Sequence, residues 1–383
     1  MKFVLAPDKY KGSLSGEEFC DAVESGLLKV FPKAQVLKKP LADGGDGTLE
    51  VVKHYLNAEI VSTTVQDPLF REIKSDYLFS KDKGVAFIEM SEASGYKLLS
   101  KTELNCMNTT SLGTGDLIKD ALEKGAREIV LGIGGSATND GGIGMATALG
   151  YQFLDSDGNE IKPIGKNLSA ISRIDGTNIH PKLQGVEFKV ACDVKNPLHG
   201  KEGAAFVYGP QKGATPEDVI ALDNGLQNFA KVVHKEFGID VQNIQGAGAA
   251  GGMGAGAVVF LKASLASGID LIKEMAQFDE AIQGSDWIIT GEGQLDKQTL
   301  SGKTIAGVLQ AAKNYQIPVA AFCGSVSVSI EDLETMGLDY VTSIINQPGT
   351  LQEVKDKSFE NLVLTAYNFA KVLRVKENNS IKG

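Results

Sequence analysis

Short apolar runs that end in glycine or aspartate recur along the chain, and a segment with helical spacing of apolar positions follows each run. These runs cover residues 2–8, 36–45, 128–135, 286–293, 318–325 and 340–346. The alternation predicts a parallel sheet flanked by helices, an α/β fold. Ligand loops of such a sheet lie at the carboxyl ends of its strands, so the polar residues that follow these runs are the candidate site residues.

Two stretches, 59–105 and 151–244, have a different pattern. Residues 59–79 and 84–90 predict antiparallel strands around the turn Asp67-Pro68-Leu69-Phe70, and residues 187–194 predict a further strand. We expect the two stretches to form one smaller, inserted α/β domain. Segments 1–58, 106–150 and 245–383 are then expected to form the larger, discontinuous domain.

The length of the chain agrees with two domains, and its composition excludes several classes of function. A chain of 383 residues exceeds the usual size of a single core. The net charge of −10, with no basic stripe, argues against nucleic-acid binding. No apolar stretch approaches the roughly 18 residues needed to span a bilayer, and the four cysteines show no metal-site spacing. We therefore expect a cytoplasmic protein that does not bind membranes.

The stretch "IVLGIGGSATNDGG", residues 129–142, is the clearest candidate ligand loop. Glycines allow close backbone approach, and the start of the following helix offers free N–H groups to an anion. The loop is more polar than a tight turn requires. Its candidate ligand contacts are Gly134, Gly135, Ser136, Thr138, Asn139 and Asp140. The same stretch fits a relaxed dinucleotide pattern, Gly132, Gly134 and Ala137 with Asp155 further on, so a nicotinamide-dependent dehydrogenase is an alternative.

Two loops near the N-terminus combine charges with helix starts. In the first, Ser15 and Glu18 predict a capping box, whereas Asp8, Lys9 and Lys11 have no capping role and are candidate substrate or phosphate contacts. The second loop places two acids, Asp43 and Asp46, around the flexible Gly44 and Gly45. Two carboxylates with a flexible backbone could hold Mg²⁺, since magnesium takes oxygen ligands and keeps much of its water. The alternative is a turn that binds no ion.

Four further loops carry candidate residues at predicted strand ends or helix starts. These residues are Ser91, Ser94, Asp193, Asn196, Gln211, Lys212, Glu292, Asp296 and Lys303. The last loop, residues 289–304, lacks the glycine spacing of a Walker A motif but joins two acids and a cation, which suits phosphate with magnesium. The glycine-rich stretch 246–256 follows no apolar strand; its glycines could serve either a nucleotide or a closely packed helix.

Ten motifs in order resemble the bacterial glycerate kinase family, class I, over nearly the whole chain. They are "APDKYKGSLS", "PLADGGDGT", "DPLFR", "IEMSEASG", "TSLGTGDLI", "GIGGSATNDGG", "DVKNPLHG", "GPQKGA", "GAGAAGGMGAG" and "TGEGQLDKQTLSGK". Lys9, Asp46 and Gln294 depart from the residues that we expect of the family at those positions. The resemblance implies a Rossmann- or flavodoxin-like domain and a smaller α/β domain with the active site in the cleft between them.

The resemblance also implies ATP- and Mg²⁺-dependent phosphorylation of D-glycerate, with 2-phosphoglycerate favoured over 3-phosphoglycerate as product. Transfer to a hydroxyl needs a proton acceptor and cations for the phosphoryl oxygens. We therefore expect Asp193 to act as base or magnesium ligand and Lys11 and Lys303 to bind phosphate or carboxylate. Asp8, Asp43, Asp46 and Asp296 compete for the metal, with Asp46 and Asp296 favoured. A non-catalytic nucleotide-binding regulator remains an alternative, and the oligomeric state, a homo-oligomer included, stays open.

Overall fold

The computed structural model describes residues 1–43, 48–296 and 304–380, and it divides the chain into two compact units. Unit 1 comprises residues 1–55 and 269–383, and unit 2 comprises residues 56–268. Within the described residues, no helix is both long enough and apolar enough to cross a membrane.

Unit 1 is built on a five-stranded parallel sheet with the strand order β15-β13-β11-β1-β2. Its strands are β1 (Lys2–Leu5), β2 (Gln35–Lys38), β11 (Trp287–Thr290), β13 (Val319–Cys323) and β15 (Tyr340–Ser343), with a small pair, β12 (Gln294–Leu295) and β14 (Ser325–Val326). Its helices are α1 (Gly16–Leu28), α2 (Thr48–Leu56), α9 (Gly268–Met275), α10 (Phe278–Ile282), α11 (Thr304–Tyr315), α12 (Ile330–Met336), α13 (Leu351–Asp356) and α14 (Ser358–Ser380).

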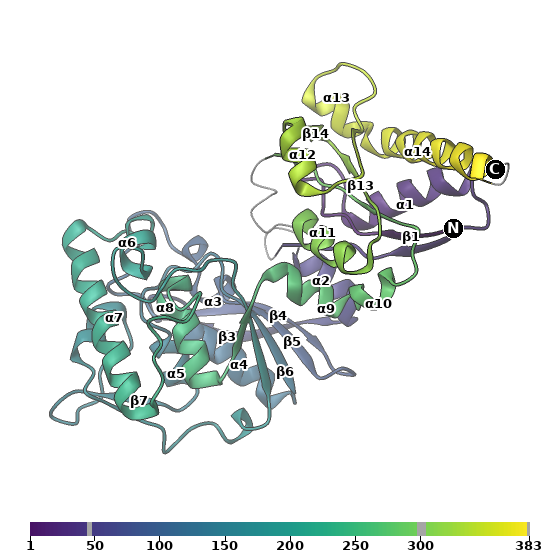
Figure 1. Cartoon of the computed structure of the whole chain (residues 1–383). Helices are drawn as coiled ribbons and strands as arrows, with labels where there is room; N and C mark the ends of the chain where they lie inside the picture. The colour runs from purple at the N-terminus through teal and green to yellow at the C-terminus, as the bar shows by residue number, and fades with distance from the viewer. Residues whose placement is uncertain (44–47, 297–303, 381–383) are drawn as a thin grey trace. The chain divides into compact units, whose positions relative to one another are not determined.

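The two ends of the chain pack together in unit 1, where α1 and α14 lie side by side (Figure 1). A Cβ at Gly26 of α1 would lie 2.4 Å from the carbonyl oxygen of Val363, so only glycine permits this approach. The predicted capping box starts α1: Ser15 Oγ accepts from the Glu18 N–H at 3.2 Å, and Glu18 Oε2 accepts from the Ser15 N–H at 2.8 Å.

Unit 2 is built on a six-stranded mixed sheet with the order β10-β9-β6-β5-β4-β3. Its strands are β3 (Glu59–Gln66), β4 (Glu72–Ser80), β5 (Val85–Glu89), β6 (Glu128–Gly132), β9 (Glu187–Ala191) and β10 (Ser264–Ala266), with a separate pair, β7 (Gln152–Leu154) and β8 (Arg173–Asp175). Its α-helices are α3 (Ser91–Ser94), α4 (Leu112–Glu123), α5 (Ile143–Ala148), α6 (Ala204–Tyr208), α7 (Pro216–Phe237) and α8 (Ala249–Gly256). Short 3₁₀ or π turns cover η1 (Tyr96–Leu98), η2 (Gly165–Ala170), η3 (Pro181–Leu183), η4 (Pro210–Lys212) and η5 (Ala257–Leu261).

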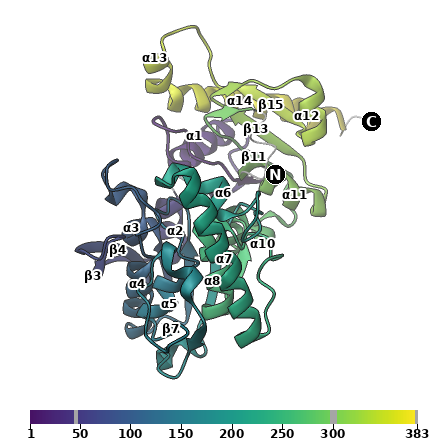
Figure 2. The same cartoon turned by 90° about the vertical axis from the view of Figure 1, so that its left-hand side faces the viewer.

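The parallel part of this sheet joins β5, β6, β9 and β10, and β3 and β4 form the predicted antiparallel hairpin. One large core fills the unit and includes Ile88, Leu131 and Phe229. Helices α4 and α5 pack against each other (Figure 2).

The α/β class and all six predicted strand segments are present, but the division into units differs from the expected one. Residues 106–150 and 245–268 lie in unit 2, because β6 pairs with β5 and β9, and β10 pairs with β9. The apolar pattern of β6 is the same as that of the unit 1 strands, so the pattern alone does not reveal which sheet the strand joins.

Candidate active site

Unit 1 carries a pocket at the carboxyl ends of its strands. β1 leads to β2 on one side of the sheet, whereas β11, β13 and β15 follow on the other, so the strand order reverses between β1 and β11. Ligands of open α/β sheets bind at such a switch point. Asp8 follows β1 and Glu292 follows β11, so the two acids flank this point.

The pocket has a volume of about 370 Å³ and brings three of the predicted loops together. Charged side chains at its wall are Asp8, Lys9, Lys11, Asp43, Glu292, Asp296 and Lys355. Apolar wall residues are Ile344, Ile345, Leu351 and Val354. Gly44, Gly45, Asp46 and Lys303, which are also predicted site residues, lie outside the described residues.

Hydrogen bonds fix Asp8 in this pocket. Its Oδ2 accepts from Thr304 Oγ1 at 2.6 Å, and its Oδ1 accepts from the Lys9 N–H at 2.7 Å. Burial, with a smaller contribution from Asp43, raises the pKa of Asp8 to about 6, against the effect of these bonds and of Lys11. A buried carboxylate beside a second acid is a position that favours a bound cation.

The glycine-rich loop of unit 2 follows β6, at the carboxyl ends of the parallel strands, as predicted. Gly134 and Gly135 are exposed, whereas the residues from Ser136 to Asp140 are buried. A Cβ on Gly134 would meet no atom within 4 Å, so its backbone is open to a ligand. The loop lies against the turn after α3, since the Tyr96 N–H donates to the Gly135 carbonyl at 3.0 Å.

Lys212 anchors this loop from η4. Its Nζ donates to Ser136 Oγ and to the Thr138 carbonyl, both at 2.7 Å, and the side chain is buried. Burial lowers the pKa of Lys212 to about 8. These two hydrogen bonds of the ammonium both go to the loop, so Lys212 holds the loop in place.

Asp140 has protein partners as well. Its Oδ2 accepts from the Ser111 N–H at 2.8 Å, from Ser111 Oγ at 2.7 Å and from the Gly144 N–H at 3.3 Å, and its Oδ1 accepts from the Gly142 N–H at 3.2 Å. Burial raises the pKa of this carboxyl, and the four bonds oppose that rise. Asp140 thus ties the start of α4 to the start of α5.

Thr138 and Asn139 differ from their neighbours in the loop. Both side chains are fully buried, and within the described ranges neither Thr138 Oγ1 nor the Asn139 amide has a hydrogen-bond partner. Buried polar groups are normally satisfied, so these atoms fit an ordered water or a ligand atom.

The other predicted residues of unit 2 divide between bonded and exposed positions. Ser94 Oγ bonds to Thr114 Oγ1 at 2.8 Å, and the Asn196 amide bonds to the Glu202 carbonyl at 2.8 Å and to the Tyr208 hydroxyl at 2.7 Å. Ser91 is partly exposed, and Gln211 is exposed.

Asp193 follows β9 and is exposed. Its Oδ1 accepts from the Gly268 N–H at 2.9 Å, where α9 begins. The carboxylate therefore has a partner on the backbone, and its role as base or metal ligand stays a prediction.

The glycine-rich stretch 246–256 supports the candidate loop by close packing. A Cβ at Gly251 would lie 2.1 Å from the Thr138 carbonyl oxygen, and one at Gly256 would lie 2.5 Å from that of Gly141. The Gly141 N–H also donates to the Gly251 carbonyl at 3.0 Å. These glycines admit the backbone of the loop itself, which supports close packing, one of the two alternatives that the sequence left open.

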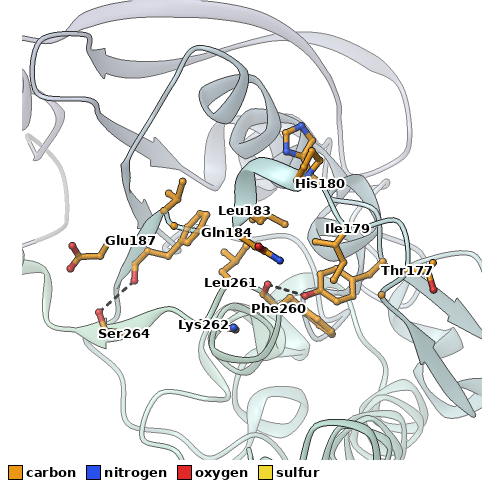
Figure 3. A pocket seen from close by; sticks show the side chains of 16 residues that line it. Thr177, Ile179, His180, Leu183, Gln184, Glu187, Phe260, Leu261, Lys262 and Ser264 are labelled. Carbon is orange, nitrogen blue, oxygen red and sulfur yellow. Dashed lines mark hydrogen bonds between the residues drawn. The ribbon is translucent and has the colours of Figure 1, made fainter.

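A larger cavity of about 760 Å³ lies in unit 2, at the amino ends of its strands (Figure 3). Glu187 and Ser264, which begin β9 and β10, line it together with Tyr151, Phe260 and Lys262. The Tyr151 hydroxyl donates to the Phe260 carbonyl at 3.3 Å across its wall. None of the predicted site residues that the structure describes lines this cavity, and it lies at the amino ends of the strands, so it is not the candidate active site.

The structure does not place Asp155 where a dinucleotide-binding site would need its acidic residue. Asp155 follows β7, which pairs with β8 outside the six-stranded sheet. The Asp155 carboxylate accepts from the N–H groups of Asp157 and Asn159 in an exposed turn. A dinucleotide fold places this acid at the end of a neighbouring strand of the same sheet, so the dehydrogenase has no support here.

One acid at the carboxyl ends of the strands, Glu89, was not among the predicted site residues. It ends β5 beside Gly132, within the motif that supplied Ser91 and Ser94. A charged residue as the last member of the apolar run Val85–Glu89 is the signal that could have identified it.

Comparisons with known proteins agree on one family. The model of the glycerate kinase family matches residues 3–374. The chain is 44% identical to a glycerate kinase of Bacillus cereus over 98% of both chains, and 42% identical to glycerate 2-kinase of Escherichia coli over 99% of this chain and all of the other. A crystal structure described as glycerate kinase 2 from Salmonella typhimurium matches with a TM-score of 0.88 and 42% identity, over 99% of each chain. The chain therefore belongs to the glycerate kinase family and is a phosphotransferase.

Proposed function

We propose that the protein transfers the γ-phosphoryl group of ATP to D-glycerate. The observation that carries the proposal is that both units place polar loops at the carboxyl ends of their parallel strands, in a chain whose relatives are named glycerate kinases. A coupled assay of ADP release tests it. We expect ADP formation that depends on both D-glycerate and Mg²⁺; ADP formation that D-glycerate does not increase would contradict the proposal.

The pocket of unit 1 suits the nucleotide. Its apolar wall, formed by residues such as Leu351 and Ile345, can cover the base, while Lys9 and Lys11 can neutralise the phosphates. The loop Gly134–Asp140 of unit 2 suits the small, anionic glycerate, since it offers exposed glycine backbone and a buried cation behind it.

We expect Leu351→Asp to raise the KM for ATP at least about tenfold, because burial of the whole leucine side chain under the base would contribute on the order of 1.5–3 kcal/mol. Leu351 is 72% exposed, so the substitution leaves the core intact. The matched control is Val372→Asp, which changes an exposed residue of α14 outside the pocket wall. Steady-state kinetics measure the effect, and an unchanged KM for ATP would place the nucleotide elsewhere.

Magnesium fits the acidic end of the same pocket. Asp8, Asp43, Glu292 and Asp296 line this end, and carboxylate oxygens are the ligands that this cation prefers. Over the ranges that the structure describes, no cluster of three or more His, Cys, Asp or Glu side chains is placed to hold a metal. Magnesium is commonly held by one or two carboxylates, by water and by the phosphates of the nucleotide. When bound, it would neutralise charge on the phosphoryl oxygens.

Asp8→Asn is therefore expected to raise the Mg²⁺ concentration for half-maximal activity by roughly 10–100-fold, the loss of metal affinity typical when the ligand environment is altered. A titration of activity with Mg²⁺ at saturating ATP measures this shift. Glu353→Gln, at an exposed capping residue of α13, is the control. An unaltered Mg²⁺ dependence in Asp8→Asn would remove Asp8 from the metal site.

The 2-position of glycerate is the proposed site of phosphorylation. The support is the name of the Escherichia coli relative, a glycerate 2-kinase that is 42% identical over 99% of this chain.

A further inference from the structure

Glu89 is an acidic residue at the carboxyl end of the parallel strands of unit 2. It is the last residue of β5 and lies in register with Gly132 of β6, the residue from which the glycine-rich loop departs. Gly132 in turn pairs with Ala191 of β9, and Ala191 pairs with Ala266 of β10. Four parallel strands therefore end at the same level, and Glu89 is the acidic residue among these four paired residues.

The Glu89 carboxylate leans over β6. Its Oε2 lies 2.5 Å and its Oε1 2.9 Å from the point that a Cβ of Gly132 would occupy. Glycine at position 132 thus makes room for this side chain. The carboxylate is thereby held at the base of the loop that continues through Gly134 and Gly135 to Ser136.

Glu89 is partly exposed, and the protein does not neutralise its carboxylate. Across the described parts of the chain, no residue forms a hydrogen bond or an ion pair with it. Charged groups act on it from the packed elements: Glu92 of α3 and Lys97 of η1, which pair with each other. Burial, and then Glu92, raise the pKa of Glu89 to about 7, and Lys97 opposes them.

We propose that Glu89 is the general base of the reaction, accepting the proton of the glycerate hydroxyl that attacks the γ-phosphorus. This inference rests on the proposed function. An oxygen–phosphorus bond forms to glycerate, the bond between the γ-phosphorus and the bridging oxygen breaks, and ADP leaves. The proton passes to the Glu89 carboxylate and then to solvent. A base whose pKa lies near neutral pH suits this step, whereas Asp193 is exposed and bonded to Gly268.

The test compares Glu89→Gln with Glu92→Gln and Asp193→Asn in the full chain. Wild type must first show D-glycerate-dependent ADP formation; its absence would overturn the proposed function and not this assignment. Given that activity, Glu89→Gln is expected to lower kcat by roughly 10²–10⁴ with an unchanged KM for ATP and an unchanged circular dichroism spectrum.

The pH profile separates a base from a structural residue. Below pH 7 the Glu89 carboxyl is protonated and cannot accept a proton, so wild-type kcat/KM should fall as pH falls through about 7. Glu89→Gln should lack this acid limb. Glu92→Gln should stay active at pH 8 and move the limb to lower pH, because Glu92 raises the pKa of Glu89.

Gly132→Ala supplies an independent variant. The three atoms nearest to the added methyl group all belong to the flexible end of Glu89, so the fold should persist while the carboxylate is displaced and kcat falls. Glu89→Gln with kcat within a few-fold of wild type would overturn the assignment. So would an acid limb that survives in Glu89→Gln, or one that disappears in Asp193→Asn instead.

Discussion

Asp140→Ala is expected to destabilise unit 2 by about 3–5 kcal/mol, the cost of removing one member of a buried, charge-assisted network. The carboxylate is fully buried and accepts four hydrogen bonds from Ser111, Gly142 and Gly144. Alanine leaves these donors without an acceptor in a place that water does not reach. Asp140→Asn should also destabilise, since its amide group would present N–H donors to N–H donors.

Urea unfolding followed by circular dichroism measures the loss for Asp140→Ala. The control is Asp157→Ala, at an exposed turn of the same unit, which should change the free energy of unfolding by no more than about 0.5 kcal/mol. If Asp140→Ala unfolds within 1 kcal/mol of wild type, the network does not hold the two helix starts together, and the residue is free to serve a ligand.

Lys212→Met is expected to separate activity from stability. Methionine keeps most of the volume of the lysine stem and removes a buried charge, so the fold should persist. Without the bonds to Ser136 Oγ and the Thr138 carbonyl, the loop loses its anchor. A displacement of about 1 Å in a substrate-holding loop can cost roughly 100-fold in rate, and we expect at least that loss in kcat/KM for D-glycerate.

Steady-state kinetics with each substrate varied in turn measure this effect of Lys212→Met. The KM for ATP should change little, because the nucleotide is proposed to bind unit 1. Lys231→Met, at an exposed position of α7, is the matched control and should behave as wild type. Near-normal kcat/KM for D-glycerate in folded Lys212→Met would show that the loop keeps its geometry without the lysine.

Local sequence patterns predicted the local structure of this protein. The capping box of Ser15 and Glu18, the hairpin around Asp67 and the strand segments before the polar loops are all present. Each of these features depends on residues close together in sequence, so that periodicity and spacing are sufficient signals.

Features that depend on residues far apart in the sequence could not be predicted from the sequence alone. β6 resembles the strands of unit 1 in its apolar pattern, but the pairing with β5 and β9 assigns it to unit 2. Asp140 looks like a ligand contact in the sequence because it follows glycines. Its main partner, Ser111, lies 29 residues away, and only the fold brings the two together. Glu89 is a candidate base because it lies beside Gly132 of the neighbouring strand, and the sequence does not show this proximity either.

The most direct measurement is proton-coupled ³¹P nuclear magnetic resonance of a reaction containing the protein, Mg²⁺, ATP and D-glycerate. A phosphate on the single-proton C2 of glycerate gives a doublet, and one on the two-proton C3 gives a triplet. We predict a new phosphomonoester doublet that grows together with ADP. A triplet would contradict phosphorylation at the 2-position, and the absence of any new phosphomonoester signal would contradict glycerate phosphorylation by this protein.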